Sequence, residues 1–434
     1  MWTSALRLGA DCSAGALAGI SPSSMPLIGH PCRTFVLVEI GLIRKQRFGG
    51  GWYPDSRGSG VADTMDLSSA AFERVDAVFA DMEVPEHPGA ALLVIDHDER
   101  VYSKCYGFAD LETQQPITAD SSFYLASISK QFTAMAIMLL AERSKLSFDD
   151  RLLVYFPRFP AWGAEITLRH LLHHISGLPE YFHLFSSSER IPEFTRSITG
   201  VTNEAVLERV IGVPGPDFPV GTQYAYSNTG YVLLALIVAI VSGQSFADFL
   251  KANVFDPLGM KHTFVYDASR PARHRLAQGY IEEAGQFQRW DYPLLTAGDG
   301  GLFSTLDDLF LWDQALNSEQ LVPKASLEEA FTSGTTNDGT SVDYGFGWFT
   351  NVLPYLSAAE RAQLLAFGGP GQRHVAHGGS LCHYNYIIRC LDTRRTIIVL
   401  TNYSSIPGPR VRAHQVAEIL FSQAENRPSN ESLS

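Results

Sequence analysis

Residues 124–146 read YLASISKQFTAMAIMLLAERSKL, a short polar segment followed by a long apolar one. The apolar residues predict a helix buried at the centre of the fold. Ser127 and Lys130 stand three positions apart at its start, so their side chains share one face. Serine often caps a helix, and lysine is common on helix surfaces. Taken alone, the pair is compatible with a helix cap and an incidental lysine.

A nucleophile beside its base is the chemical alternative for this pair. The N–H groups at a helix start lack intrahelical partners, and the dipole there is positive. An oxyanion formed by attack of Ser127 would be stabilised at this place. Burial and the same field favour the neutral form of Lys130, which can take the proton of a serine hydroxyl. The rest of the chain has to decide between the two interpretations.

Strand patterns lie at both ends of the chain, in residues 90–96, 101–110, 374–379, 382–390 and 394–402. Helix patterns flank them, in 65–82, with Ser68 or Ser69 as the cap, and in 410–423. The middle of the chain is mostly helical. Compact packing places the terminal strands in one antiparallel sheet flanked by helices, with the helical region inserted beside it. The predicted fold class is therefore α+β, with a cleft between the two parts.

The first 64 residues differ from the rest of the chain, because they mix Gly, Ser, Pro and Arg and end in a linker-like GGGWYPDSRGSG. We expect residues 1–64 to be an N-terminal extension, with Met65 a better start for the functional chain. A single domain should occupy 65–422, followed by a flexible tail over 423–434. Asp11 interrupts the apolar stretch that a signal peptide would need, so we expect a cytoplasmic protein, with a periplasmic or secreted one as the alternative.

Composition narrows the partners. The chain has 434 residues, 45% of them hydrophobic, and a net charge of -13, which disfavours nucleic acid and anionic membrane surfaces. The longest apolar run, 231–243, is too short to cross a bilayer and indicates a buried helix. Five cysteines without a CxxC pair favour neither a disulfide framework nor a cysteine zinc site. Among the possible partners this leaves a small-molecule or peptide substrate, and we expect neither a cofactor nor a metal. The sequence does not indicate an oligomeric state.

A second candidate group is Tyr226-Ser227-Asn228, in a loop that leads into the apolar helix. A tyrosine near a lysine can lose its proton more easily and act as a base or proton shuttle. Asparagine offers a donor and an acceptor to a substrate amide. The structural alternative is that Asn228 caps the helix.

A third group is His377-Gly378-Gly379-Ser380, in a strand pattern. Glycines in a strand often mark the close approach of a ligand or another backbone. Such a strand edge could bind a peptide-like substrate and offer the N–H of Ser380 to an oxyanion. A tight turn is the alternative. The segment also misses G-x-S-x-G, because position 382 is Cys.

Three other features are interpreted structurally. His170 and His174 have the spacing of zinc ligands, but position 171 is Leu where HExxH needs Glu, so we expect structural histidines. Residues 297–305, AGDGGLFST, lack the lysine of a phosphate loop and predict a tight packing loop near the cleft. Ser176 lies in a turn with nothing nearby to activate it.

Ser127-x-x-Lys130, Tyr226-x-Asn228 and His377-x-Gly379 follow one another in an order that resembles the superfamily of serine β-lactamases and penicillin-binding proteins. The likeness is greatest to the class C β-lactamase-like group, which includes esterases and D-amino-acid peptidases. It extends over about residues 66–422. Six stretches carry it: 125–137, 166–180, 218–231, 255–264, 297–312 and 375–402.

The resemblance implies a β-lactamase/transpeptidase-like fold and a role for each motif residue. Ser127 would accept the acyl group, and Lys130 and Tyr226 would share the proton transfers. Which of these two is the base stays open. Asn228, His377, Gly379 and Ser380 would bind substrate, with the N–H groups of Ser127 and Ser380 forming the oxyanion hole.

His377 departs from the pattern, because many members have a lysine at this position. Histidine is mostly neutral at pH 7, so the site has less fixed positive charge for a substrate carboxylate. We therefore expect a serine hydrolase of esters or amides that works through an acyl-enzyme. The alternatives are a β-lactamase or D-alanyl or D-amino-acid peptidase, and a catalytically silent binding protein on the same scaffold.

Overall fold

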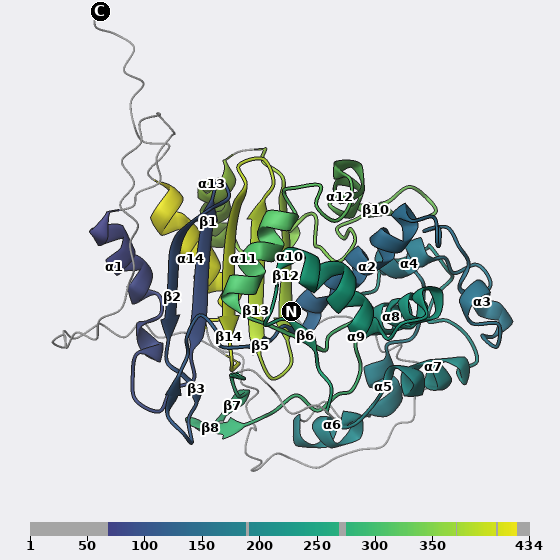
Figure 1. Cartoon of the computed structure of the whole chain (residues 1–434), viewed down its shortest axis with the longest axis horizontal. Coiled ribbons are helices and arrows are strands. Elements are labelled where there is room, and N and C mark those ends of the chain that lie inside the picture. Colours follow the sequence, from purple (N-terminus) through teal and green to yellow (C-terminus); the bar gives the residue numbers. More distant parts are fainter. Residues whose placement is uncertain (1–67, 188–190, 269–274, 370, 405–406, 423–434) are drawn as a thin grey trace, which may run out of the picture. The chain divides into compact units, whose positions relative to one another are not determined.

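A computed structural model describes residues 68–187, 191–268, 275–369, 371–404 and 407–422 (Figure 1). The chain divides into two units, Met1–Val61 and Ala62–Ser434, and every described residue belongs to the second. The expected extension, the expected start at Met65 and the expected tail over 423–434 lie outside the described residues. Within the described residues, the cysteines are free thiols: Cys105, Cys382 and Cys390.

A five-stranded antiparallel sheet in the order β12-β13-β14-β1-β2 forms the centre of this unit (Figure 1). Its strands are β1 (Ala90–Asp96), β2 (Glu99–Tyr106), β12 (His374–Ser380), β13 (Tyr384–Cys390) and β14 (Arg395–Thr401). Leu93 of β1 pairs with Ile398 of β14, so the two ends of the unit meet in the middle of the sheet. The predicted antiparallel sheet of terminal strands is confirmed.

The hairpin between β1 and β2 is tighter than expected, because the predicted strands 90–96 and 101–110 left four residues between them. His97 and Asp98 have φ of +50° and +69° and form the turn, while Glu99 already starts β2. Two central residues with positive φ match the right-handed twist of the strands they connect.

Side chains of β1 alternate between two cores because successive strand residues point to opposite faces. Leu92 belongs to a core with α1 (Ser69–Ala77), α13 (Ala358–Gly368) and α14 (Pro409–Phe421). Leu93 belongs to the core that contains α2 (Lys130–Glu142), α8 (Asn228–Ser242) and α11 (Leu306–Ala315). Figure 1 shows α1 and α14 on one side of the sheet and the helical region on the other. Ser68 caps α1 by accepting the N–H of Ala71.

The helical region contains most of the remaining helices. They are η2 (Ala126–Ser129), α3 (Leu152–Tyr155), η3 (Ala161–Gly163), α4 (Leu168–Leu172), α5 (Tyr181–Phe185), α6 (Ile191–Ile198), α7 (Asn203–Ile211), α9 (Phe246–Leu250), the π-helical turn η4 (Lys251–Phe255), α10 (Asp256–Leu258) and α12 (Lys324–Ala330). Two further 3-10 turns are η1 (Ala80–Met82) and η5 (Leu353–Tyr355).

Short strands line the connections between these helices. They are β3 (Phe108–Asp110), β4 (Gln115–Pro116), β5 (Phe123–Tyr124), β6 (Phe264–Val265), β7 (Tyr280–Glu283), β8 (Gln286–Arg289), β9 (Leu302–Ser304), β10 (Gly334–Thr335) and β11 (Ser341–Val342). β9 lies between β5 and β6 in a small sheet, and this brings the loop before Leu302 toward the start of α2.

The apolar helix predicted at 231–243 is α8, and Gly243 ends it with a φ of +69°. Within the described ranges, no single helix is long and apolar enough to span a membrane. One bent pair, Asn228–Ser242 with Phe246–Leu258, passes the length and composition test jointly, at an angle of 77°. Most of α8 is buried in the core.

Candidate active site

Ser127 lies in η2, the 3-10 turn directly ahead of α2. Ala126 before it has a φ of +49°, a left-handed conformation that costs a non-glycine residue free energy and is held here by burial. The Ser127 side chain is half-buried, and its hydroxyl lies 3.1 Å from the Lys130 amine. The turn therefore presents a serine hydroxyl to the first residue of a buried helix.

Lys130 is fully buried, and its amine has three oxygen neighbours. They are Ser127 Oγ at 3.1 Å, Asn228 Oδ1 at 2.7 Å and the Asp299 carbonyl at 2.8 Å. Burial lowers the pKa of Lys130 from 10.5 to about 8, against the opposing effect of the Asp299 and Glu180 carboxylates. The neutral amine is therefore accessible near neutral pH.

This arrangement determines where a neutral Lys130 amine presents its lone pair. A neutral amine has two N–H groups, and Asn228 Oδ1 and the Asp299 carbonyl are acceptors only. If both N–H groups are donated to them, the lone pair is left for the third neighbour, the Ser127 hydroxyl. The site can therefore transfer the serine proton to Lys130.

Asn228 is not the helix cap. Ser227 caps α8 by accepting the N–H of Gly230 at 3.2 Å, which leaves the Asn228 side chain for other partners. Its Nδ2 donates to Glu180 Oε1 at 3.3 Å, and its backbone N–H donates to Glu180 Oε2 at 2.7 Å. Glu180 thereby fixes the amide orientation that directs Oδ1 at Lys130.

Tyr226 lies against the Lys130 amine, with the Nζ atom 4.8 Å from the ring centroid. Its hydroxyl is buried beside the Ser127 hydroxyl. The expected easier loss of its proton is not what the structure shows. Burial raises the pKa of Tyr226 well above 10, although the nearby Ser127 hydroxyl lowers it. Tyr226 is therefore a neutral phenol at ordinary pH.

Asp299 belongs to the glycine-rich loop that the sequence identified only as a packing loop. Gly298 has a φ of +105°, and a Cβ there would lie 2.4 Å from the Tyr231 carbonyl, so the close approach to α8 requires glycine. The loop directs the Asp299 carbonyl to Lys130 and its Oδ2 to the Tyr181 hydroxyl at 3.0 Å. Burial raises the pKa of the Asp299 carboxyl above its ordinary value, with Lys130 opposing.

His377 is buried in β12. Its Nε2 lies 2.9 Å from the Tyr344 hydroxyl, and its Nδ1 lies 2.6 Å from the Gly378 carbonyl. Its ring centroid is 6.2 Å from that of Tyr226. Burial, helped by the charge of Lys130, lowers the pKa of His377 to about 3. A lysine-like positive charge is therefore absent from this position above that pH.

β12 is the edge strand of the sheet and passes the serine turn closely. A Cβ on Gly379 would lie 2.2 Å from the Leu125 carbonyl, so only glycine allows this approach. Ala376 exchanges backbone hydrogen bonds with Phe349 on the outer edge. Strand alternation then directs the N–H of Ser380 to the same outer side. The strand can thus offer a backbone donor beside Ser127.

Sequence motifs missed Glu180 and Asp299 because their contacts arise only from tertiary packing. Glu180 follows the SGLP turn and caps α5, and Asp299 acts on Lys130 through a backbone carbonyl. Burial raises the pKa of Glu180 to about 7, while the N–H of Asn228 lowers it. The high glycine content around Asp299 was the one available signal, because it marks a loop forced close to its neighbours.

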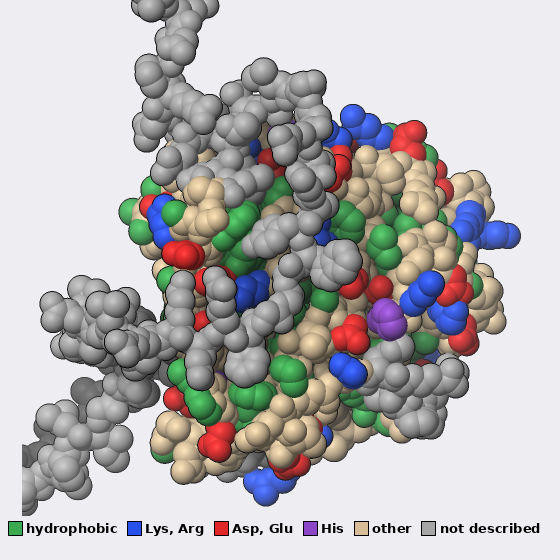
Figure 2. Space-filling model, turned by 60° about the vertical axis from the view of Figure 1, so that its left-hand side comes forward, with side chains coloured by type: hydrophobic (Ala, Val, Ile, Leu, Met, Phe, Trp, Pro, Cys, Tyr) green, Lys and Arg blue, Asp and Glu red, His purple; other side chains and the backbone are tan. Residues whose placement is uncertain are grey.

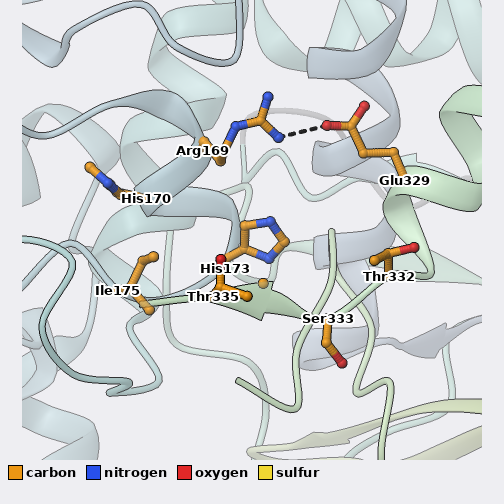
Figure 3. Close-up of a pocket in the computed structure, with 9 residues that line it drawn as sticks. Arg169, His170, His173, Ile175, Glu329, Thr332, Ser333 and Thr335 are labelled. Atoms are coloured by element: carbon orange, nitrogen blue, oxygen red, sulfur yellow. Dashed lines mark hydrogen bonds and ion pairs between the residues drawn. The ribbon is translucent and has the colours of Figure 1, made fainter. Parts of the chain in front are cut away.

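A cavity of about 280 Å³ lies elsewhere in the helical region (Figure 3). Arg169 pairs with Glu329 at 2.6 Å along its wall, and the His173 side chain faces it. Its lining residues include none of the motif residues and no serine beside a buried amine. His170 accepts the Thr167 N–H at 3.1 Å, as part of a helix cap. In the described ranges, no group of three or more His, Cys, Asp or Glu side chains is arranged to hold a metal ion.

Comparison with known proteins agrees with this architecture. The family model described as Beta-lactamase matches residues 75–421. Penicillin-binding protein 4* of Bacillus subtilis is 34% identical over 355 residues, 78% of this chain and 73% of that protein. The D-aminopeptidase of Brucella anthropi is 27% identical over 324 residues, 73% of this chain and 56% of that protein.

A solved structure gives the same result for the fold. The octameric penicillin-binding protein homologue from Pyrococcus abyssi superposes with a TM-score of 0.65 at 26% identity, covering 82% of this chain and 77% of its own. The matched span includes every strand of the central sheet from β1 to β14. The chain therefore belongs to the beta-lactamase family, within the superfamily of serine β-lactamases and penicillin-binding proteins, and it is a serine hydrolase.

Proposed function

We propose that the chain hydrolyses esters or amides through an acyl-enzyme on Ser127, with Lys130 as the base. The observation that supports this most directly is the buried Lys130 amine, 3.1 Å from the Ser127 hydroxyl and bound to two pure acceptors. Burial lowers the pKa of Lys130 to about 8, whereas it raises that of Tyr226 well above 10. Lys130 is accordingly the better base.

In the first step Ser127 Oγ bonds to the substrate carbonyl carbon and its proton passes to Lys130. The N–H groups of Ser127 and Ser380 stabilise the oxyanion. The bond to the leaving group then breaks, and the leaving group takes the proton back from Lys130 through the Tyr226 hydroxyl. Water attacks the acyl-enzyme in the second step, releases the acid and restores the Ser127 hydroxyl.

The charges around Ser127 favour substrates without a carboxylate beside the scissile bond. His377 is neutral, and Glu180 and Asp299 add negative charge next to Lys130. On the face shown in Figure 2, acidic and basic side chains are interspersed rather than gathered by sign.

Side-by-side assays of p-nitrophenyl butyrate and nitrocefin test this proposal, because both release a coloured product. We expect turnover of the ester, with a butyryl group on Ser127 detected by intact-mass and peptide mass spectrometry. Faster turnover of nitrocefin than of the ester would favour the β-lactamase alternative. Absence of any acyl group on Ser127 would favour the silent binding protein.

Replacement of Tyr226 by phenylalanine should slow esters to different extents, according to whether the leaving group needs a proton. We expect kcat for ethyl butyrate to fall ~10²-fold, because ethanol leaves only with a proton, and kcat for p-nitrophenyl butyrate to fall much less. Steady-state kinetics with both esters measure the difference. Tyr155→Phe, in α3, is the matched control and should behave as the wild type. Equal losses on the two esters would contradict a relay through Tyr226.

A second candidate function, hydrolysis of substrates with a free amine, is favoured by Glu180. This carboxylate is half-buried beside Asn228. Its Oε1 accepts from Asn228 Nδ2 and from the Phe182 N–H, whereas Oε2 accepts only the Asn228 N–H and has spare acceptor capacity. A substrate ammonium group could pair with it. The likeness to a D-aminopeptidase supports the same idea.

Glu180→Gln tests this candidate with D-alanine p-nitroanilide and its N-acetyl derivative. We expect the variant to lose roughly tenfold more in kcat/KM on the free amine than on the acetylated compound, because a charged hydrogen bond is lost. Any loss that arises through Asn228 is shared by the two substrates. Since the pKa of Glu180 is about 7, the wild-type preference for the amine should grow as pH rises through 7. A preference that is unchanged in the variant would contradict amine recognition.

A further inference from the structure

His174, expected from the sequence to be a structural histidine, holds the backbone on both sides of Tyr226. Its carbonyl accepts the N–H of Ala225 at 3.0 Å, and its ring Nδ1 accepts the N–H of Ser227 at 3.1 Å. Tyr226 lies between these two bonds. A single residue from the end of α4 therefore fixes the peptide groups before and after the Tyr226 side chain.

The His174 ring also packs directly on the walls of the site. Its centroid lies 4.3 Å from that of Tyr226 and 4.4 Å from that of Tyr344. The Tyr344 hydroxyl in turn bonds His377 Nε2. His174 is thus in contact with Tyr226 through the ring as well as through the adjoining backbone.

Two features of His174 cost free energy. Because Nδ1 accepts the Ser227 N–H, the proton of the neutral ring is on Nε2, and that atom is buried without a partner among the described residues. The backbone φ of His174 is +60°, a left-handed conformation rare outside glycine. Strain of this kind beside a reacting group points to a functional role.

The ring stays neutral over the working pH range. Burial, followed by the charge of Lys130, lowers the pKa of His174 well below 6.5. The Nδ1 lone pair is therefore always available to Ser227. Within the described part of the chain, His174 is the side chain that bonds the Ser227 N–H.

We propose that His174 is a positioning residue that holds the Tyr226 hydroxyl in register with Lys130 and Ser127. It does so through its Nδ1 bond to the N–H of Ser227 and through ring contact. This inference rests on the proposed function, in which Tyr226 relays a proton. If His174 were purely structural, its replacement would lower stability. The accompanying loss of kcat would then be the same with and without the Tyr226 hydroxyl.

A double-mutant cycle tests the proposal. His174→Leu removes the acceptor, whereas His174→Asn keeps an acceptor near the Nδ1 position and tolerates the left-handed backbone. Both are made with Tyr226 intact and in Tyr226→Phe. We measure kcat and KM for ethyl butyrate and the midpoint of thermal unfolding.

We expect His174→Leu to lower kcat ~10²-fold with KM nearly unchanged, as for a misplaced reacting group. His174→Asn should recover most of this loss. In the Tyr226→Phe background, His174→Leu should change kcat by less than about twofold, because coupled residues are not additive. An equal loss in both backgrounds, or an asparagine variant as slow as the leucine variant, would overturn the proposal.

If His174→Leu fails to fold, His174→Gln takes its place in the cycle. The glutamine side chain is one methylene longer than asparagine, so its amide oxygen is misplaced for the Ser227 N–H. Equal kcat values for the asparagine and glutamine variants would then overturn the proposal, and a slower glutamine variant would support it. A wild type that forms no acyl group on Ser127 would overturn the proposed function together with this inference. If the wild type forms the acyl group and the losses of kcat in the double-mutant cycle are additive, only the role of His174 is overturned.

Discussion

Ser127→Ala is expected to lower the turnover of p-nitrophenyl butyrate by ~10³-fold or more, because the acyl-enzyme forms on the Ser127 hydroxyl. The Lys130 amine would lose the oxygen that its lone pair faces, 3.1 Å away. Intact-mass spectrometry after rapid acid quenching measures the acyl group directly. The wild type should carry one butyryl group, and the variant should carry none.

The matched control is Ser103→Ala, an exposed serine on β2, which should keep wild-type turnover. The half-buried Ser127 contributes little to packing, so the thermal midpoint of Ser127→Ala should stay close to that of the wild type. A folded Ser127→Ala protein that kept a tenth or more of the activity would rule out Ser127 as the nucleophile. Ser176, whose hydroxyl accepts the Leu178 N–H, would then be the next serine to replace.

The sheet was predictable because its signals are local. The apolar run of β1, the hairpin that follows it and the serine cap of α1 each follow from a few neighbouring residues. The pairing of β1 with β14 joins segments about 300 residues apart, and chain order plus the need to cover apolar faces predicted it. The exact turn at His97 was less predictable, since positive φ for such residues depends on the twist of the finished hairpin.

The candidate site was only partly predictable. Ser127, Lys130, Tyr226 and Asn228 are brought together as the motif order suggested. The titration of Tyr226 was not predictable, because nearness to a lysine suggested easier proton loss, while burial of the hydroxyl has the larger and opposite effect. Burial depends on side chains from distant segments, and sequence spacing does not report it.

The pH dependence of acylation is the second large effect expected. With the pKa of Lys130 lowered from 10.5 to about 8, about a tenth of it is neutral at pH 7, roughly 300-fold more than for an unperturbed lysine. Protonation removes the lone pair that faces Ser127. We therefore expect kcat/KM to rise about tenfold per pH unit below 8 and to level off above it. Stopped-flow acylation by p-nitrophenyl butyrate between pH 5.5 and 9.5 measures this profile.

Lys130→Ala should lower the acylation rate by ~10³-fold at pH 8 and above, because no base remains beside the Ser127 hydroxyl. The loss should shrink as pH falls, because the wild-type Lys130 is then increasingly protonated. The variant leaves a space that a small amine can enter, so added propylamine should restore part of the rate. The rescued rate should follow the titration of the added amine, which distinguishes loss of the base from misfolding. Lys145→Ala, exposed beyond the end of α2, is the matched control and should keep the wild-type profile. A Lys130→Ala protein that retained the inflection near pH 8 would show that another group supplies the base, and the assignment of Lys130 would then fail.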